Sequence, residues 1–500
     1  MKKLNIFLFA ILGILALSSC EDFLDKRPTN SADSGSAVEK LDDAQVMMNG
    51  IMTKICSSSY LGRNFFLYAD AKGGDLTITS IGQGNDLYLY NHTVGSNTYS
   101  GFWTVGYNVI LQINNLLANI DKLEKAGSTD NFTDMKGQAL TLRAMIYFDL
   151  VRLYGQPYNE DKTAWGVPNV LEPLDAMSQE LRATVEQNYT TIVNDLTTAQ
   201  SLLSKSTKKG FVNYWANKAL QARVYLHMEK WSDALAAAED IIDNGPYDLY
   251  TPAKWVDSWK SRWGSESIFE LEMNSGENAL SGTGSLGAYY AREAHFNSNM
   301  GSYMASTAFL NLLGEDAEDV RWGVMDYDER SKSYDKKYTE DRYACCYKYL
   351  GGLYNKDSKS FPGDDAAQPA YAVNIKVIRL SEVYLAAAEA AFQAGDKEKA
   401  AEYVQAIRDR SPNLDPATKT TVTMEMIENE RAKELYGEGH KFWDMMRWNK
   451  TIEFDDEFGP VYPTHRESKV DRTHAKTLLP IFQSEINANP GIAAQQNPGY

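Results

Sequence analysis

Residues 379–412 carry the sequence RLSEVYLAAAEAAFQAGDKEKAAEYVQAIRDRSP, which decides the fold class. In its first half, apolar side chains recur every three or four positions, as in a helix that packs along one face. This stripe consists of Leu380, Val383, Tyr384, Ala387, Ala388, Ala391 and Phe392. Gly395 follows, where a helix end favours a left-handed residue. Ala400, Val404 and Ile407 continue the stripe, so the stretch predicts two helices joined at Gly395.

A second stretch, residues 214–246, repeats this pattern. Each stretch has two alanines 12 residues apart and a proline 24 residues after the first: Ala222, Ala234 and Pro246, then Ala388, Ala400 and Pro412. Small alanines let two helices cross closely. Proline ends the second helix because it lacks an N–H and clashes with the preceding turn. A helix-turn-helix unit of about 34 residues is typical of tetratricopeptide repeats.

Two further helical units are predicted. The first helix of one contains Ala139, Arg143, Ala144, Tyr147, Phe148 and Val151. A turn-rich stretch, residues 155–168, delays its partner, which is expected to begin at Thr184, form a capping box with Gln187, and run to Leu203. The last unit spans residues 422–448. We therefore predict a mainly α fold with about four helix pairs, within 139–246 and 379–448, that bury one another.

The remaining segments have a different composition. Residues 62–101 and 247–375 are rich in Gly, Asn, Ser and Tyr, which predicts a large irregular, loop-rich part. Long loops of this kind often carry function. Trp255, Trp259 and Trp263 within it fit either a core or an exposed platform.

A helix is expected to begin near Trp103. Trp103 and Tyr107 share helical spacing with Ile110, Ile113 and Asn114, so we assign both aromatic side chains to the core.

The overall composition excludes several classes of protein. The 500 residues carry a formal net charge of −17, and so acidic a surface repels phosphate, which argues against nucleic acid as a partner. The four cysteines, Cys20, Cys56, Cys345 and Cys346, are too few for a disulfide-stapled protein. No CxxC or HxxxH pattern occurs, so neither a metal nor another cofactor is expected.

The first residues predict a lipoprotein. The basic start Met1-Lys2-Lys3 precedes a run, residues 4–17, that is apolar except for Asn5. The small residues Ser18 and Ser19 then lead to Cys20. We interpret residues 1–19 as a signal peptide and Cys20 as a lipobox cysteine carrying acyl chains such as palmitate. Residues 20–36 form a polar tether. No apolar run of 18 residues follows Cys20, so the lipid alone is expected to anchor the chain.

Several motifs resemble one known family. They are Cys20-Glu21-Asp22-Phe23-Leu24-Asp25, Arg143-Ala144, Gly155-Gln156-Pro157-Tyr158, Gly166-Val167-Pro168, Glu430-Arg431-Ala432-Lys433-Glu434-Leu435, Gly437-Glu438-Gly439-His440-Lys441-Phe442-Trp443-Asp444, Arg447-Trp448, Leu479-Pro480-Ile481-Phe482, Glu485-Ile486, Asn489-Pro490 and Gln496-Asn497-Pro498-Gly499-Tyr500. Together they resemble the SusD/RagB family of nutrient-binding outer-membrane lipoproteins. Phe482, Lys441 and Met446 depart from the family's usual residues without breaking the pattern.

The resemblance implies a fold and a function. It implies one SusD-like domain over residues 37–500, with a tetratricopeptide-like half and an irregular half that holds the ligand. It also implies a lid on a SusC-like TonB-dependent barrel, to which the lipoprotein delivers oligosaccharide or, in some members, peptide. Acidic residues after the lipobox, here Glu21 and Asp22, resemble signals for the outer face of the outer membrane. No catalysis is implied.

The carboxylate-rich signature is assigned a structural role. Glu430, Arg431, Glu434, Glu438 and Arg447 stand at helical spacing, where residues three or four apart can form ion pairs. Buried ion pairs and cap contacts explain such a cluster more simply than catalysis.

Candidate ligand residues come from the two irregular regions. A sugar site needs exposed aromatic faces beside groups that pair with hydroxyls. The candidates are Asn85, Asp86, Tyr88, Tyr90, Asn91, Asn97 and Tyr99 in one loop, and Tyr289, Tyr290, Arg292 and Tyr303 in the other. The resemblance places family ligand residues broadly in these regions, but no motif matches them residue by residue. The alternative for Tyr88 and Tyr90 is a short strand with one packed face.

Three alternatives to glycan capture remain. A surface glycoside hydrolase needs two carboxylates across a cleft, and the chain has no GxSxG, HExxH or P-loop motif. A tetratricopeptide scaffold that binds only proteins is the second. A peptide-capturing member of the same family is the third, since tyrosine binds peptides as well as sugars.

Overall fold

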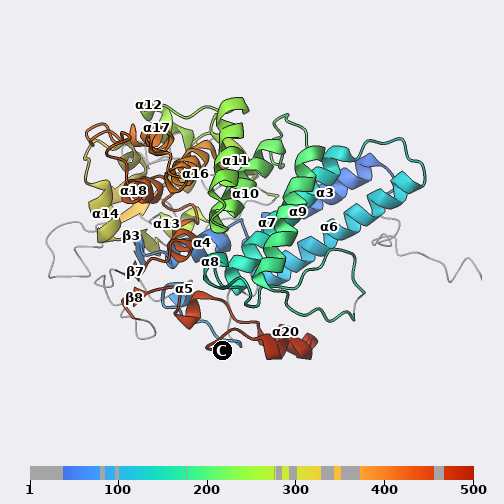
Figure 1. Ribbon diagram of the computed structural model, residues 1–500. Helices are drawn as coiled ribbons and strands as arrows, with labels where there is room; N and C mark the ends of the chain where they lie inside the picture. The colour runs from blue at the N-terminus through green and yellow to red at the C-terminus, as the bar shows by residue number, and fades with distance from the viewer. Residues whose placement is uncertain are drawn as a thin grey trace, which may run out of the picture.

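The computed structural model describes residues 38–78, 85–95, 99, 101–175, 177–274, 276–277, 284–291, 301–327, 343–350, 372–454 and 467–500. Figure 1 shows α3 (Leu41–Ile55), α6 (Gly101–Lys125), α7 (Thr133–Tyr154) and α9 (Val185–Leu202) grouped at one end. At the other end lie α14 (Thr307–Leu313), α17 (Lys397–Arg408) and α18 (Met424–Glu434). The predicted signal peptide, the tether and Cys20 lie outside the described residues.

The helices pack as antiparallel pairs. Beyond α7 with α9, the pairs are α10 (Tyr214–His227) with α11 (Trp231–Asn244), and α16 (Leu380–Gln393) with α17, and α11 also packs on α16. The pairs therefore stack into one array across the molecule (Figure 1). This confirms the predicted mainly α, tetratricopeptide-like fold.

Local details of the repeat are confirmed. Gly395 has a φ of +88°, which an L side chain rarely adopts, so glycine suits the turn between α16 and α17. Ala388 and Ala400 are fully buried where these two helices meet. Thr184 caps α9, and its capping box with Gln187 is complete.

The last predicted unit is arranged differently. α18 packs on α16 and α17, which extends the array, whereas α19 (Lys441–Arg447) packs on α4 (Asn64–Ala71). α4 is buried along its whole length. The C-terminal signature therefore joins the helical array to the irregular half of the molecule.

The segments predicted to be irregular contain many short elements. The strands are β1 (Leu76–Ile78), β2 (Ser267–Leu271), β3 (Tyr303–Ala305), β4 (Met325–Tyr327), β5 (Ala344–Cys346), β6 (Ile375–Arg379), β7 (Ile452–Glu453) and β8 (Lys469–Val470). The short helices are α5 (Asn85–Tyr88), α8 (Tyr158–Asp161), α12 (Pro252–Ser258), α13 (Gly287–Tyr290), α20 (Gln483–Ala488), η3 (Val320–Val324), η4 (Lys348–Leu350), η5 (Ala475–Thr477) and η6 (Pro490–Gln495).

The strands form small antiparallel sheets. The largest has the order β1-β3-β5-β4, while β2 pairs with β6 and β7 with β8. The proposed strand at Tyr88 and Tyr90 is wrong, because Tyr88 ends helix α5 and Tyr90 has a φ of +53°.

Most of the aromatic assignments hold. Trp103 is buried in α6 as predicted, and Tyr107 packs against the core. Trp255 and Trp259 are fully buried, which settles them as core, while Trp263 is half-buried. In the part of the chain that the structure describes, no helix is long and apolar enough to cross a bilayer.

Candidate functional site

The two predicted ligand loops meet at one end of the β1–β3 pair. β1 and β3 are antiparallel, with Ile78 opposite Tyr303. The chain that leaves β1 after Ile78 and the chain that enters β3 before Tyr303 therefore emerge from the same end. This places the first candidate loop beside the second, although about 190 positions separate Tyr99 from Tyr289.

Tyrosines of the second loop form one aromatic cluster. The rings of Tyr289 and Tyr303 stack with their centroids 5.8 Å apart, and the Tyr290 ring lies 6.2 Å from both Tyr303 and Tyr349. The Arg63 guanidinium stands over the Tyr289 ring at 5.3 Å, where the negative ring face attracts a cation. Arg63 also donates to the carbonyl of Gly284 at 3.1 Å, so it holds the start of this loop.

Tyr90 and Tyr88 of the first loop pack inward, and Tyr90 contacts a buried lysine. The Tyr90 hydroxyl donates to the carbonyl of Lys72 at 2.9 Å, and the Lys72 ammonium lies 4.3 Å from the Tyr90 ring centroid. Burial lowers the pKa of Lys72 well below its usual range. The Tyr88 ring packs edge-on against Phe454 at 5.4 Å.

Asp86 and Tyr99 link the two loops electrostatically. Burial, followed by the nearby Tyr303 and Asp86, raises the pKa of Tyr99 well above its usual value. Asp86 is half-buried and Asn91 is exposed. Asp86 and Tyr99 therefore lie close to Tyr303 of the second loop, whereas Asn91 is tied to its own loop by an N–H bond to the carbonyl of Asp86.

The expected exposure of the tyrosines is wrong. Six candidates are between 1% and 4% exposed: Tyr88, Tyr90, Tyr99, Tyr289, Tyr290 and Tyr303. The physical reason is that their rings pack on one another and on core aromatics. The free energy gained by this burial exceeds that of leaving the rings in water. Asn85 begins α5, while Asn97 and Arg292 lie outside the described residues. Contact of any of these residues with a ligand stays a prediction.

The sequence missed one residue that supports this site. Asp70, at the end of buried helix α4, accepts a 2.6 Å hydrogen bond from the Tyr290 hydroxyl and also accepts from the Gly439 N–H. Burial raises the pKa of Asp70 to about 7, and these hydrogen bonds oppose the shift. The signal was present in residues 64–71, whose apolar side chains surround the helix on all sides and so indicate burial.

The signature carboxylates form a buried ion cluster. Glu434 lies 2.5 Å from Arg410 and 3.0 Å from Arg379, and Glu438 pairs with Arg379 at 2.8 Å and with Lys348 at 2.7 Å. All of these side chains are at most 5% exposed. Their partners come mainly from distant segments, and only pairs such as Glu430 with Lys433 use the expected helical spacing. The cluster fixes α18 against its neighbours.

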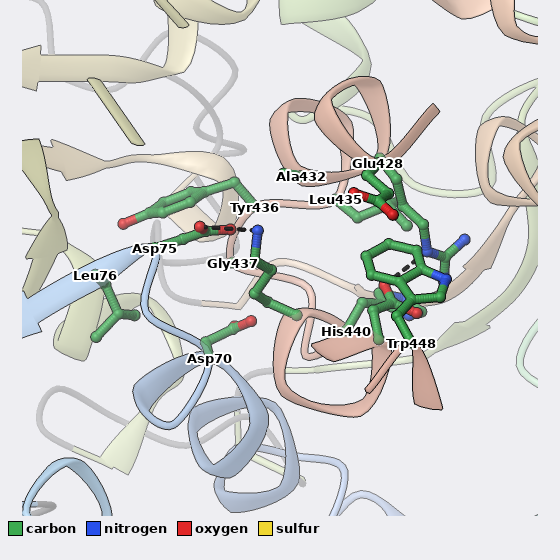
Figure 2. A pocket seen from close by; sticks show the side chains of 13 residues that line it. Asp70, Asp75, Leu76, Glu428, Ala432, Leu435, Tyr436, Gly437, His440 and Trp448 are labelled. Atoms are coloured by element: carbon green, nitrogen blue, oxygen red, sulfur yellow. Dashed lines mark hydrogen bonds and ion pairs between the residues drawn. The ribbon is translucent and has the colours of Figure 1, made fainter. Parts of the chain in front are cut away.

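A narrow pocket beside this cluster is closed by ion pairs. Figure 2 shows Asp70 and Asp75 on one side, with His440 and Trp448 on the other. Lys441 pairs with Asp75 at 3.1 Å, and Arg431 pairs with Asp444 at 2.6 Å. These charged side chains thus pair with one another within the protein and are not left to bind a ligand in this pocket. No group suited to a metal ion occurs among the described residues.

Comparison with known families decides the identity of the chain. A model described as the SusD family matches residues 205–500, which is more than half of the sequence. The chain belongs to the SusD family. A second model, described as starch-binding associating with outer membrane, matches residues 22–226. The SusD family consists of binding proteins rather than enzymes.

Solved structures and curated relatives agree with this assignment. A SusD superfamily protein of Bacteroides thetaiotaomicron is 35% identical, spans 92% of this chain and all of its own, and has a TM-score of 0.82. A Bacteroides vulgatus protein described as sugar-binding is 32% identical over 93% of this chain and all of its own, with a TM-score of 0.79. A SusD-like protein of Formosa agariphila is 24% identical over both full lengths.

Proposed function

We propose that this SusD-family chain is a cell-surface lipoprotein that binds an oligosaccharide and delivers it to a partner TonB-dependent outer-membrane transporter. The observation that carries the proposal is the convergence of two Tyr- and Asn-rich loops at one end of the β1–β3 pair. The starch-binding description of the matching model and the sugar-binding relative support the ligand class.

The chemistry of the converging loops suits a sugar. Asp86 and Asn91 offer acceptors and donors for hydroxyl groups, and Arg63 lies nearby over the Tyr289 ring. The stacked tyrosines behind them form a rigid floor, which reduces the ordering cost of binding.

The anchor is proposed to be the acylated Cys20. The proposed tether, residues 20–36, has a polar composition and joins this cysteine to the SusD-like domain. At its far end, the N–H of Leu41 donates to Asp130 at 2.9 Å, which fixes α3 to the turn between α6 and α7. Such an anchor keeps the protein on the membrane while letting it tilt over a transporter.

A binding screen of residues 21–500 tests the proposal. The panel contains plant, microbial and host-mucosal glycans and a peptide pool, titrated by calorimetry. We expect saturable binding of one glycan class, weakened about tenfold in Asn91→Ala and Asp86→Asn. Asn244→Ala, an exposed asparagine at the end of α11, is the matched control and should bind as wild type.

The outcomes separate the alternatives. Binding of peptides alone would replace the ligand class and leave the fold intact. Glycan binding that neither loop variant weakens would refute the proposed site. Alanine variants of Tyr88 or Tyr290 are poor tests, because both rings are buried and their loss would damage the core.

A further inference from the structure

Exposed apolar side chains gather on one connection of the helical half. Seven large apolar side chains are exposed in the described part of the chain, and five of them lie within residues 165–181. We call these five the apolar strip: Trp165, Leu171, Leu174, Met177 and Leu181. Met177 is 85% exposed. Exposed apolar side chains that cluster in one segment often mark an interaction site.

The apolar strip lies on the connection 165–181, and hydrogen bonds from buried side chains hold residues 170–172 of this connection. Asn114 donates to the carbonyls of Val170 and Glu172 at 3.0 and 3.2 Å, and Tyr147 donates to the carbonyl of Val170 at 2.8 Å. Arg143 donates to the carbonyl of Leu171 at 3.1 Å. Arg143 and Asn114 are themselves buried, so the backbone is fixed while the apolar side chains point outward.

A second buried arginine fixes the other part. Arg182 is 3% exposed and donates to the carbonyls of Gly166, Trp165 and Tyr154 at 2.6, 3.0 and 2.6 Å. Asn489 donates to the carbonyl of Glu180 at 2.7 Å. Two sets of hydrogen bonds therefore hold this segment, which contains no helix or strand, at both of its ends. These bonds offset the conformational entropy that is lost when such a segment is ordered. A rigid segment with outward apolar side chains is suited to docking.

A cavity opens beside the strip. It has a volume of about 490 Å3 and lies between this connection, the start of α6 and α20. Leu174 and Met177 line it on one side, Trp103 and Tyr107 on another, and Glu485 and Asn489 on the third. The volume falls within the range of about 300–1,000 Å3 for ligand pockets. Its lining includes none of the residues proposed to form the glycan site.

The side chains at this cavity favour an apolar protein segment over a sugar. A sugar needs an exposed ring face, but Trp103 is only 6% exposed. The exposed large apolar side chains that line the cavity, Leu174 and Met177, are aliphatic, and methionine adapts its shape to varied apolar partners. Leu174 and Met177 could therefore enclose apolar side chains inserted from another protein.

The charges around the strip indicate which charged residues the partner segment should carry on either side of its apolar side chains. Glu172, Asp175 and Glu180 are exposed along the strip, and residues 163–181 contain no lysine or arginine. The acidic border attracts basic side chains and repels a second copy of this chain, whose net charge is −17. We propose that the apolar strip and its cavity dock a segment of a partner protein with an apolar core flanked by Lys or Arg.

Two synthetic peptides test this proposal on residues 21–500. Both carry the core Leu-Phe-Leu-Leu and a fluorescent label, one with two lysines on each side and the other with two glutamates. We expect the lysine peptide to bind at least tenfold more tightly by fluorescence anisotropy, and added salt to weaken it because the border charges are exposed.

Variants place the binding on the strip. Met177→Asp should weaken the lysine peptide at least tenfold without affecting the fold, since this side chain is 85% exposed. Val46→Asp is the matched control, because Val46 is an apolar side chain 69% exposed on α3. Glycan binding at the β1–β3 end should persist in Met177→Asp, which separates this proposal from the proposed function.

Each contrary outcome overturns the docking proposal. These outcomes are equal affinity for both peptides, no binding of the lysine peptide, or lysine-peptide binding that Met177→Asp leaves intact. Competition by an oligosaccharide would assign the cavity to sugar instead. Concentration-dependent dimers in sedimentation, lost in Met177→Asp, would assign the strip to a second copy of the chain.

Discussion

The hydroxyl of Tyr290 donates a 2.6 Å hydrogen bond to Oδ2 of Asp70, on a helix 220 residues earlier in the chain. Asp70 also accepts from the N–H of Gly439, in the turn between α18 and α19. One buried carboxyl group therefore joins the second candidate ligand loop, buried helix α4 and the family signature. The geometry of the proposed site depends on this junction.

Asp70 should make stability depend on pH. Its pKa is about 7 when folded, against 3.8 for the free side chain, because burial disfavours the charge. Between these values the folded state holds a proton that the unfolded state has lost, so this group's contribution to stability falls as pH rises. The measured quantity is the difference in the free energy of unfolding between wild type and Asp70→Asn. This difference should fall by up to about 1.4 kcal/mol for each unit that the pH rises.

Urea titrations of both proteins from pH 4 to pH 8 measure this difference. The decline should level off above about pH 7, where Asp70 is ionised in both states. A difference that does not change with pH would show that Asp70 is ionised throughout, contrary to its burial.

The buried ion cluster should be sensitive to the loss of one carboxylate. Glu434→Gln removes the charge that faces Arg410 and Arg379, leaving buried guanidinium groups uncompensated. We expect a loss of about 3–5 kcal/mol in the free energy of unfolding. The control is Lys162→Gln, which breaks an exposed pair with Glu186 and should hardly move the urea midpoint. Equal effects of the two variants would contradict the structural role of the cluster.

Two glycine substitutions should have opposite signs. Gly395→Ala forces a side chain into a φ of +88° and should cost about 1 kcal/mol. Gly50→Ala lies in the exposed interior of α3, where an added methyl meets no atom within 4 Å, and should stabilise by about 0.5–1 kcal/mol. Thermal unfolding of both variants checks the helix assignments, which would be wrong if Gly395→Ala were neutral.

The sequence predicted those elements whose signal is local. The stripe in 379–412, the capping box at Thr184 and the turn at Gly395 each depend on residues within one or two helical turns. Such patterns can be recognised in the sequence because each helix pair packs only against the pairs next to it. The fourth unit deviated because α19 packs on α4, a partner with no counterpart in the repeat.

The candidate site was harder to predict because its contacts are long-range. β1 and β3 have three residues each, too few for a periodic pattern, and Ile78 pairs with a residue more than 200 positions away. Tyrosine composition alone could not separate a stacked core from an exposed platform, since both use the same apolar ring. Arginines such as Arg379 and Arg410, which neutralise the signature, likewise lie outside the motif that they stabilise.

Hydrogen–deuterium exchange with and without a saturating glycan from the panel tests the central claim most directly. We expect slower exchange in residues 85–95, 284–291 and 301–305, at the end of the β1–β3 pair, and Asn91→Ala should need about tenfold more glycan to reach the same protection. Exchange in 165–181 should not change. Protection confined to 165–181, or to the helix pairs, would contradict the proposed glycan site.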